Sequence, residues 1–235
     1  MFYVEYMLKI ILFNISRKGI IKMIIAISHS KGGVGKSNTS YNLAIELSKL
    51  FNIELVDLDF QRTVTYLNEY RAEPLTIFQF DNESDLKDYI AQDNSQKVTI
   101  IDCGGFDSDL NRIAMITADL IITPVSDHST ELLGLIRFEK ILKELSEALG
   151  ETLTVRILLN DVNPQKKNLT ELKNFIEENK HFFLLNSPTP TRADYEKALQ
   201  VGKSIIEKFP NSKGADEMRE LTKEITKIIK DKING

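Results

Sequence analysis

The residues with the clearest chemistry lie at positions 28–37, in the sequence SHSKGGVGKS. Its glycines allow the backbone to curl so that successive N–H groups point at one anion. Lys36 supplies a positive charge for the terminal phosphates of a nucleotide, and the Ser37 hydroxyl suits Mg²⁺, which prefers oxygen ligands. The spacing predicts a phosphate-binding loop made of Lys31, Gly32, Gly33, Val34, Gly35, Lys36, Ser37 and Asn38.

A strand and a helix are expected on either side of this loop. The apolar run at residues 23–27 predicts a buried strand before it. After it, apolar residues recur at helical spacing, at Leu43, Ala44, Leu47 and Leu50. The positive end of that helix dipole would lie at the same anion. A strand, a glycine-rich turn and a helix start form the context in which this motif binds phosphate.

A second strand, at residues 53–56, is followed by Asp57 and Asp59 in a D-x-D-x-Q pattern. Ligands in parallel α/β sheets bind beyond the carboxyl ends of the strands, so both acids are expected near the phosphate loop. Taken alone, such a pair would more simply cap the next helix, which is expected over residues 61–70.

A third strand, at residues 97–101, ends in Asp102, Cys103, Gly104 and Gly105. We expect Asp102 to contact Mg²⁺, through water, opposite Ser37. The two glycines would let the backbone approach the γ-phosphate and move when it leaves.

The phosphate loop departs from the general G-x-x-x-x-G-K-[ST] pattern, because Ser30 stands in place of the first glycine and Lys31 is an additional lysine. This K-G-G-x-G-K-S form, together with D-x-D-x-Q and D-C-G-G, resembles the deviant phosphate loop of the ParA/MinD family of ATPases. The resemblance covers about residues 23–235, and Phe60 replaces a proline that the family usually has.

The resemblance implies a role for each motif residue. Lys31 would reach across a dimer interface to the partner subunit's nucleotide, Lys36 would stabilise the γ-phosphate, and Asp59 would position the attacking water; these are the catalytic candidates. Asp57 would support the metal-water shell. The implied cofactors are ATP and Mg²⁺, and the residues that would hold the metal are Ser37, Asp57 and Asp102.

Asn160 ends another apolar strand, at residues 154–159. By the same resemblance it would hydrogen-bond the adenine edge, whose donor–acceptor pair one carboxamide can match. The sequence Asn-Asp-Val-Asn-Pro at 160–164 is also a strong turn signal, and a turn role is the alternative.

Strands and helices alternate along the chain, with further strands expected at 75–80, 119–125 and 182–185. This alternation predicts an α/β fold, a three-layer P-loop NTPase with a mostly parallel twisted sheet and helices on both faces. Asn82 or Ser84 is expected to cap one helix, and Ser129 or Thr130 to cap a long one. His128 is interpreted as a solvated loop residue.

Positive charge is shifted toward the C-terminus. Residues 192–235 hold 10 Lys and Arg against 8 Asp and Glu, whereas the whole chain has a net charge of −4. In partition ATPases of the resembled family, basic residues here face DNA. Such contacts would reach phosphates only, without sequence preference. A solvated mixed-charge face is the alternative. The candidates are Arg192, Lys203, Lys208 and Lys213.

The two ends of the chain carry no motif of their own. Residues 1–22 are interpreted as an upstream start or an N-terminal extension, with a membrane anchor as the alternative; the ATPase domain would span 23–235. The closing helix, at 214–233, is expected to pack on the domain rather than lie on a membrane. The single cysteine, Cys103, excludes an intrachain disulfide and argues against relatives that hold an iron–sulfur cluster.

The sequence therefore predicts an ATP-hydrolysing switch of the ParA type, cytoplasmic and nucleoid-associated. It would form an ATP-dependent homodimer, bind nonspecific DNA and act with a ParB-like partner in DNA partition. A positioning ATPase that acts on a membrane or a protein complex is the first alternative. A ligase resembling dethiobiotin synthetase is the second, and Lys31 and the D-x-D-x-Q segment argue against it.

Overall fold

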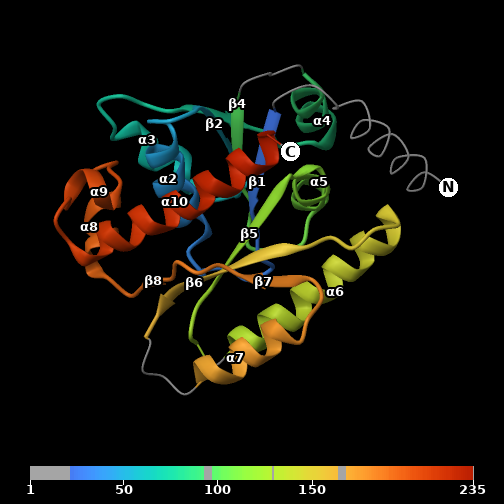
Figure 1. The fold of residues 1–235 in the computed structure, drawn as a ribbon. Helices are drawn as coiled ribbons and strands as arrows, with labels where there is room; N and C mark the ends of the chain where they lie inside the picture. The colour runs from blue at the N-terminus through green and yellow to red at the C-terminus, as the bar shows by residue number, and fades with distance from the viewer. Residues whose placement is uncertain (1–21, 93–96, 129, 164–167, 235) are drawn as a thin grey trace.

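The computed structural model describes residues 22–92, 97–128, 130–163 and 168–234. They form a central sheet between two layers of helices (Figure 1). The strands are β1 (Lys22–Ile27), β2 (Asn52–Asp57), β3 (Thr76–Gln79), β4 (Lys97–Asp102), β5 (Leu120–Val125), β6 (Val155–Val162), β7 (Phe182–Leu184) and β8 (Thr189–Pro190). The helices are α2 (Lys36–Leu47), α3 (Thr63–Glu69), α4 (Glu83–Ala91), α5 (Asp109–Thr117), α6 (Glu131–Leu149), α7 (Asn168–Glu177), α8 (Ala193–Leu199), α9 (Ile205–Lys208) and α10 (Lys213–Asn234).

The strand order is β3-β2-β4-β1-β5-β6-β7, with β8 paired to β6, and every described pair is parallel. The register sets Ile27 and Asp57 on either side of Asp102. Three strands therefore end at the same level of one sheet edge. This confirms the predicted fold class and brings the phosphate loop and the strand-end acids together.

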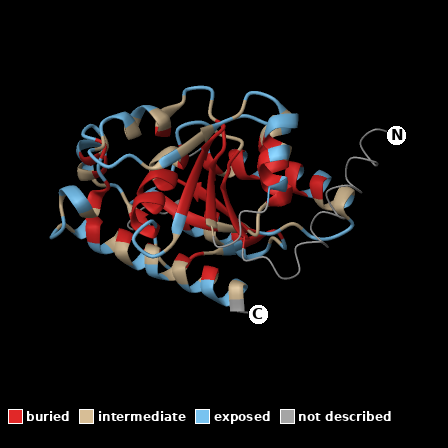
Figure 2. Cartoon of the chain, turned by 90° about the horizontal axis from the view of Figure 1, so that it is seen from above, coloured by how far each residue is buried: buried red, intermediate tan, exposed pale blue. Residues whose placement is uncertain are grey.

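Each face of the sheet has its own core, because side chains alternate along a buried strand. In β1, Ile24 and Ala26 pack in one core with α4, α5, α6 and α7, whereas Ile25 and Ile27 pack in the other with α2 and α10. The central strands are almost entirely buried (Figure 2). Such burial on both faces explains why they are continuous apolar runs in the sequence.

The closing helix packs on the domain, as expected. Leu221, Ile225 and Ile229 of α10 are fully buried in the core that also holds α2. This apolar face is therefore covered by the protein itself and is not available to a membrane. Within the described residues, no helix combines the length and the apolarity needed to cross a bilayer.

Some local details differ from the sequence predictions. β6 continues past Asn160 to Val162, with a register shift against β8 and Asp161 at a φ of 54°, so the turn expected at 160–164 does not begin at Asn160. Asn82 caps α4 through its side chain, as predicted, whereas Thr130 precedes α6 without a side-chain cap. Ser129 lies outside the described residues, and so does the expected extension except Lys22, which begins β1.

Candidate functional site

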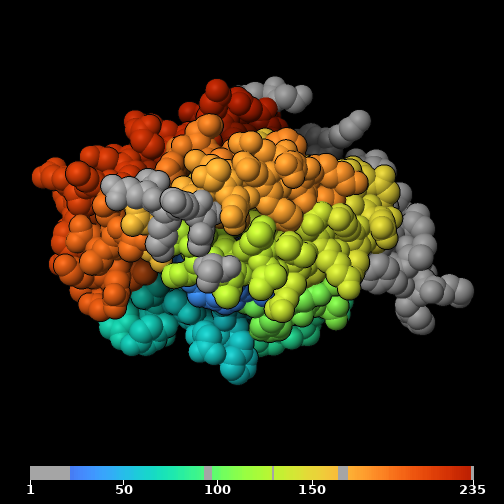
Figure 3. Space-filling view, turned by 90° about the horizontal axis from the view of Figure 1, so that it is seen from below, coloured from blue at the N-terminus to red at the C-terminus, as the bar shows by residue number. Residues whose placement is uncertain are grey.

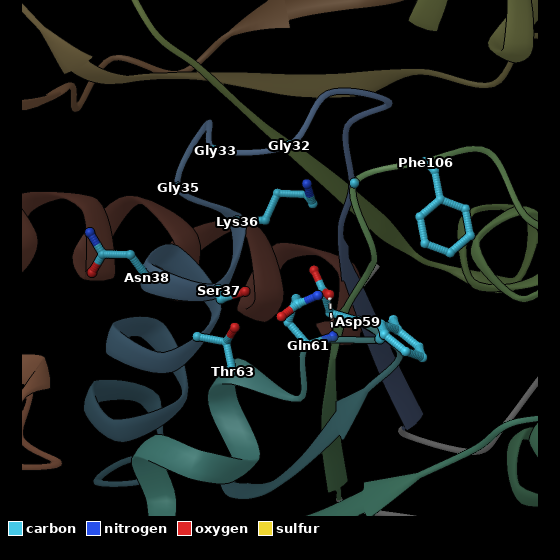
Figure 4. Close-up of a pocket in the computed structure, with 12 residues that line it drawn as sticks. Gly32, Gly33, Gly35, Lys36, Ser37, Asn38, Asp59, Gln61, Thr63 and Phe106 are labelled. Carbon is cyan, nitrogen blue, oxygen red and sulfur yellow. Dashed lines mark hydrogen bonds between the residues drawn. The ribbon is translucent and has the colours of Figure 1, made fainter.

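The phosphate loop joins β1 to α2 and opens onto a cleft of about 630 Å³. Gly33 and Gly35 have φ values of 76° and 91°, a region that side chains other than glycine rarely adopt. The loop contributes Gly32, Gly33, Gly35, Lys36, Ser37 and Asn38 to the cleft wall (Figure 4). The Val34 side chain is buried beneath the loop. The loop thus presents backbone and polar groups to the cleft.

Lys36 is held at the start of α2, and its side chain is buried. Its Nζ donates a hydrogen bond to the carbonyl oxygen of Lys31, 3.0 Å away. Burial lowers the pKa of Lys36, and the nearby Asp102 carboxylate opposes that shift. The ammonium group therefore lies inside the curl of the loop, where an anion would be a stronger partner than a carbonyl.

Asp102 is fully buried at the end of β4, with one oxygen left without a partner. Its Oδ1 accepts a hydrogen bond of 2.7 Å from Ser40, whereas Oδ2 makes none with the described residues. Burial raises the pKa of Asp102 to about 7, against the lowering effect of the Ser37 and Ser40 hydroxyls. A buried, orphaned carboxylate oxygen beside a hydroxyl fits Mg²⁺ or one of its waters.

The metal site would rely on few protein ligands. Within the described part of the chain no cluster of three His, Cys, Asp or Glu side chains could hold a metal. Mg²⁺ keeps several waters and takes other ligands from phosphates, so one carboxylate and one hydroxyl suffice. Ser40 was missed at the sequence level. It lies one helical turn after Lys36, and that spacing is the signal that identifies it.

Asp57 and Asp59 organise the segment that follows β2. The buried Asp57 accepts hydrogen bonds from the backbone N–H of Asp59 at 3.1 Å and from the Thr65 hydroxyl at 2.7 Å. Asp59 accepts one of 2.8 Å from the backbone N–H of Gln61, and it lines the cleft (Figure 4). Asp57 also accepts a hydrogen bond of 3.1 Å from the Thr65 N–H in the first turn of α3, whereas the Asp59 bond lies before that helix and Asp59 faces the cleft.

The turn after β4 lies directly against the phosphate loop. A Cβ atom on Gly105 would lie 2.9 Å from the Gly32 Cα, so only glycine permits this approach. Asn111 of α5 holds the turn, because its Oδ1 accepts a hydrogen bond from the Gly104 N–H at 3.1 Å and its Nδ2 donates one of 2.7 Å to the Phe106 carbonyl. Asn111 was another residue that the sequence did not reveal, since no motif marks it, although its partners lie only five and seven residues before it.

Residues 25–206 match the family described as the CobQ/CobB/MinD/ParA nucleotide-binding domain. The chain belongs to that family. A protein named ParA from Rhizobium radiobacter is 25% identical over 188 residues, which cover 77% of this chain and 84% of that protein. The family assignment makes the cleft a nucleotide site and the fold that of P-loop ATPases.

Solved structures share the fold at low sequence identity. Apo McdA from Cyanothece superposes with a TM-score of 0.68 at 15% identity, over 87% of this chain and 99% of that chain. MinD from Pyrococcus horikoshii, complexed with Mg-ADP, superposes with a TM-score of 0.65 at 17% identity, over 88% of this chain and 97% of that chain. A plasmid partition protein from Borrelia burgdorferi bound to AMPPNP superposes with a TM-score of 0.61 at 16% identity, over 90% of this chain and 99% of that chain.

Asn160 supports the family's phosphate loop from behind. Its Nδ2 donates a hydrogen bond of 2.8 Å to the Val34 carbonyl, and its Oδ1 accepts one of 2.8 Å from the Thr189 hydroxyl. The side chain is buried, and a Cβ on Gly35 would lie 2.2 Å from Nδ2. In this arrangement each end of the carboxamide has one partner in the protein, which fixes the side chain beneath the loop.

Lys31, the family's additional lysine, does not line the cleft. Its side chain lies along the start of α6, where Nζ donates hydrogen bonds of 2.8 Å to Glu131 and 3.1 Å to the Thr130 hydroxyl. The lysine is therefore held within its own subunit in this structure.

The four candidate DNA contacts belong to one stretch of the chain: Arg192 precedes α8, Lys203 lies between α8 and α9, Lys208 ends α9 and Lys213 begins α10. These three helices lie on one side of the molecule (Figure 1). Arg192 is paired with Glu217, with an Nη2–Oε1 distance of 2.6 Å, so its charge is largely neutralised. Lys203, Lys208 and Lys213 are exposed and have no acidic partner among the described residues. His128 is exposed, as predicted.

Proposed function

We propose that this chain is an ATP-hydrolysing switch that forms a homodimer around bound ATP, binds nonspecific DNA and drives plasmid or chromosome partition with a ParB-like partner. The observation that carries the proposal is the second lysine, Lys31, which lies one residue before the glycines of a complete phosphate site but outside its own cleft. A lysine in that place supports a role at a second subunit's phosphates. The relative named ParA supports the partition role.

The chemistry would follow from the cleft residues. Lys36 and the loop N–H groups would bind the β- and γ-phosphates and stabilise charge that develops during transfer. Asp59 would orient the attacking water, and Lys31 of one subunit would neutralise phosphate charge in the other. Mg²⁺, held through Ser37 and Asp102, would supply further positive charge to the phosphates; Asp57 would support this site by fixing the Asp59 segment.

DNA binding would use the exposed lysines near the C-terminus. Lys203, Lys208 and Lys213 present an uncompensated charge to solvent. Long flexible ammonium side chains reach phosphates without reading bases, so binding would be independent of sequence and sensitive to salt. A protein with this activity would be found on the nucleoid in the cytoplasm.

The decisive experiment measures self-association and DNA binding with ATP, a slowly hydrolysed ATP analogue, ADP or no nucleotide. The wild-type chain is expected to sediment as a dimer and to shift nonspecific DNA only with ATP or the analogue. Lys31→Ala and Lys36→Ala should abolish both, whereas Lys197→Ala, which removes an exposed lysine on α8, should not. Normal ATP-dependent dimers in either of the first two variants would contradict the mechanism.

A second candidate is a positioning ATPase that acts on a membrane or a protein complex. It is favoured by the similar fold of MinD and McdA, with TM-scores of 0.65 and 0.68. The buried apolar face of α10 argues against that helix as a membrane contact. Co-sedimentation with anionic vesicles separates the two candidates: ATP-dependent pelleting with vesicles but not with DNA would favour the second.

A further inference from the structure

Lys31 makes a defined contact with a residue 100 positions further along the chain. Its Nζ donates to Oε2 of Glu131 at 2.8 Å and to the Thr130 hydroxyl at 3.1 Å. Glu131 is the first residue of α6, and the start of that helix lies beside the segment that follows β1, seen as blue next to yellow-green in Figure 3. The lysine side chain is 28% exposed, whereas that of Glu131 is 1% exposed.

Glu131 is a buried carboxylate whose other partners are neutral. Oε2 also accepts a hydrogen bond of 2.7 Å from Ser126, and Oε1 faces the Nε2 atom of His29 at 3.3 Å. The Lys31 backbone N–H donates to Nδ1 of the same ring at 3.0 Å, so the ring proton is on Nε2. Burial lowers the pKa of His29, which keeps the ring uncharged. Among the described residues, Lys31 thus supplies the only full positive charge in contact with Glu131.

The first two turns of α6 are shaped to receive residues 29–31. A Cβ on Gly134 would lie 3.4 Å from Lys31 Cδ and 3.1 Å from His29 Cε1, so the missing side chain leaves room for both. The His29 ring stacks on Phe138, with centroids 5.4 Å apart and 10° between planes. Positions 131, 134 and 138 share one helix face. The ion pair therefore belongs to a packed contact between residues 29–31 and one face of α6.

We propose that Glu131 is a positioning residue for Lys31: it holds the lysine in its own subunit without nucleotide, and Lys31 must leave it to enter the partner's site. This inference rests on the proposed function. A bound ligand shifts such an equilibrium only by its difference in affinity for the two states. The attraction between Glu131 and Lys31 therefore sets the affinity for Lys31 that a competing anion must exceed. The γ-phosphate exceeds it, whereas ADP, which lacks that phosphate, leaves Lys31 on Glu131.

Glu131→Gln tests the proposal, because glutamine keeps the size of the side chain but carries no charge. Its one oxygen can face the Nε2–H of His29, and its NH2 group can donate to the Ser126 hydroxyl. Each subunit must break its Lys31–Glu131 ion pair when the dimer forms, so the wild-type dimer loses two such pairs. Removing the Glu131 charge should therefore lower the dimer dissociation constant with the ATP analogue by about tenfold. Glu139→Gln is the matched control: it removes an ion pair of 2.6 Å with Lys143 on the same helix, away from Lys31. Sedimentation equilibrium gives the constants, and thermal unfolding checks that each variant folds.

The reactivity of the Lys31 amine gives a readout that general damage to the fold would not reproduce. Acylation followed by mass spectrometry should show Lys31 protected in the nucleotide-free wild type, relative to the exposed Lys208, which has no acidic partner among the described residues. Glu131→Gln should raise labelling at Lys31, whereas Glu139→Gln should leave it unchanged. The wild-type measurement needs no variant, so it tests the contact even if Glu131→Gln does not fold.

The outcomes separate this inference from the function on which it rests. A wild-type chain that never dimerises with ATP overturns the proposed function. A wild-type chain that dimerises, with a Glu131→Gln variant whose dimer is unchanged or weaker, overturns the role of Glu131 and leaves the proposed function intact. Wild-type Lys31 that is labelled as fast as Lys208 without nucleotide also overturns the role of Glu131.

Discussion

Lys31 and Lys36 lie five residues apart, yet the fold gives them opposite surroundings. Lys36 is buried inside the loop and donates to a carbonyl, whereas Lys31 is partly exposed and paired with a carboxylate from another helix. Only Lys36 lines the cleft. The difference arises because one lysine begins α2 and the other precedes the glycines, where the chain passes α6. Two residues of one type in one motif therefore make separate kinds of contact.

Glu131 should also affect how the free energy of unfolding depends on pH. Burial alone would raise its pKa, but hydrogen bonds from His29, Lys31 and Ser126 outweigh burial and lower the pKa to about 2. A carboxylate with a lowered pKa stabilises the fold above its unfolded value of 4.5, and this stabilisation is lost as the pH falls through about 2. Denaturant unfolding of wild type and Glu131→Gln should differ most at pH 6, and the difference should shrink steadily below pH 4. A difference that stays constant across this range would contradict the assignment.

At the scale of elements, the strand–loop–helix unit depends on one tight contact between Gly35 and Asn160. Gly35 has a φ of 91°, and a Cβ there would overlap the Asn160 carboxamide. Gly35→Ala should therefore destabilise the fold by about 1–3 kcal/mol for the backbone alone, plus the cost of displacing Asn160, and should abolish nucleotide binding. Calorimetry of the fold and titration with fluorescent ADP would measure both effects.

Gly150→Ala is a matched control for that prediction. Gly150 ends α6 with a φ of 73°, and a Cβ there would meet nothing within 4 Å. This variant should carry the backbone strain without the clash, and nucleotide binding should be retained. If the two variants lost equal stability and Gly35→Ala still bound nucleotide, the contact with Asn160 would not be what requires glycine at position 35.

The sequence predicted those parts of the site that belong to a recognisable motif. Lys36 and Ser37 could be assigned from the spacing of the loop, and Asp102 from its position at the end of an apolar strand. Asn111 could not, because no motif marks it even though its contacts are local, and Glu131 could not, because its contact with Lys31 spans 100 residues. The contacts of Asn160 were also hidden, since a local turn signal does not report that β6 continues and pairs with β8.

At the scale of the whole molecule, α2 connects the nucleotide cleft to the basic C-terminal surface. It begins at Lys36, and further along it Asn42 accepts a hydrogen bond of 2.9 Å from the Ile205 N–H. The Tyr41 hydroxyl donates one of 3.1 Å to the Gly202 carbonyl. These bonds fix the segment that carries Lys203 and Lys208 to the helix that would bind phosphate.

The basic surface gives the prediction that separates DNA binding from the ATP switch. Replacing Lys203, Lys208 and Lys213 together by alanine should abolish the shift of nonspecific DNA while the dimer still forms with ATP, because these side chains are exposed and remote from the cleft lining. If binding is only weakened, the slope of log K against log salt should fall by about three per subunit, since each phosphate contact contributes about 0.9.

A second triple variant keeps this test specific. Lys223, Lys227 and Lys230 are exposed lysines on α10, so replacing them by alanine removes the same net charge from a different place. DNA binding should then change little, because local phosphate contacts rather than overall charge hold the DNA. Equal losses in the two triple variants would show that only net charge matters. If the variant that lacks Lys203, Lys208 and Lys213 bound DNA normally, any DNA-binding surface would have to lie elsewhere. If neither variant nor the wild type bound DNA, the alternative of a positioning ATPase that acts on a membrane or a protein complex would gain support.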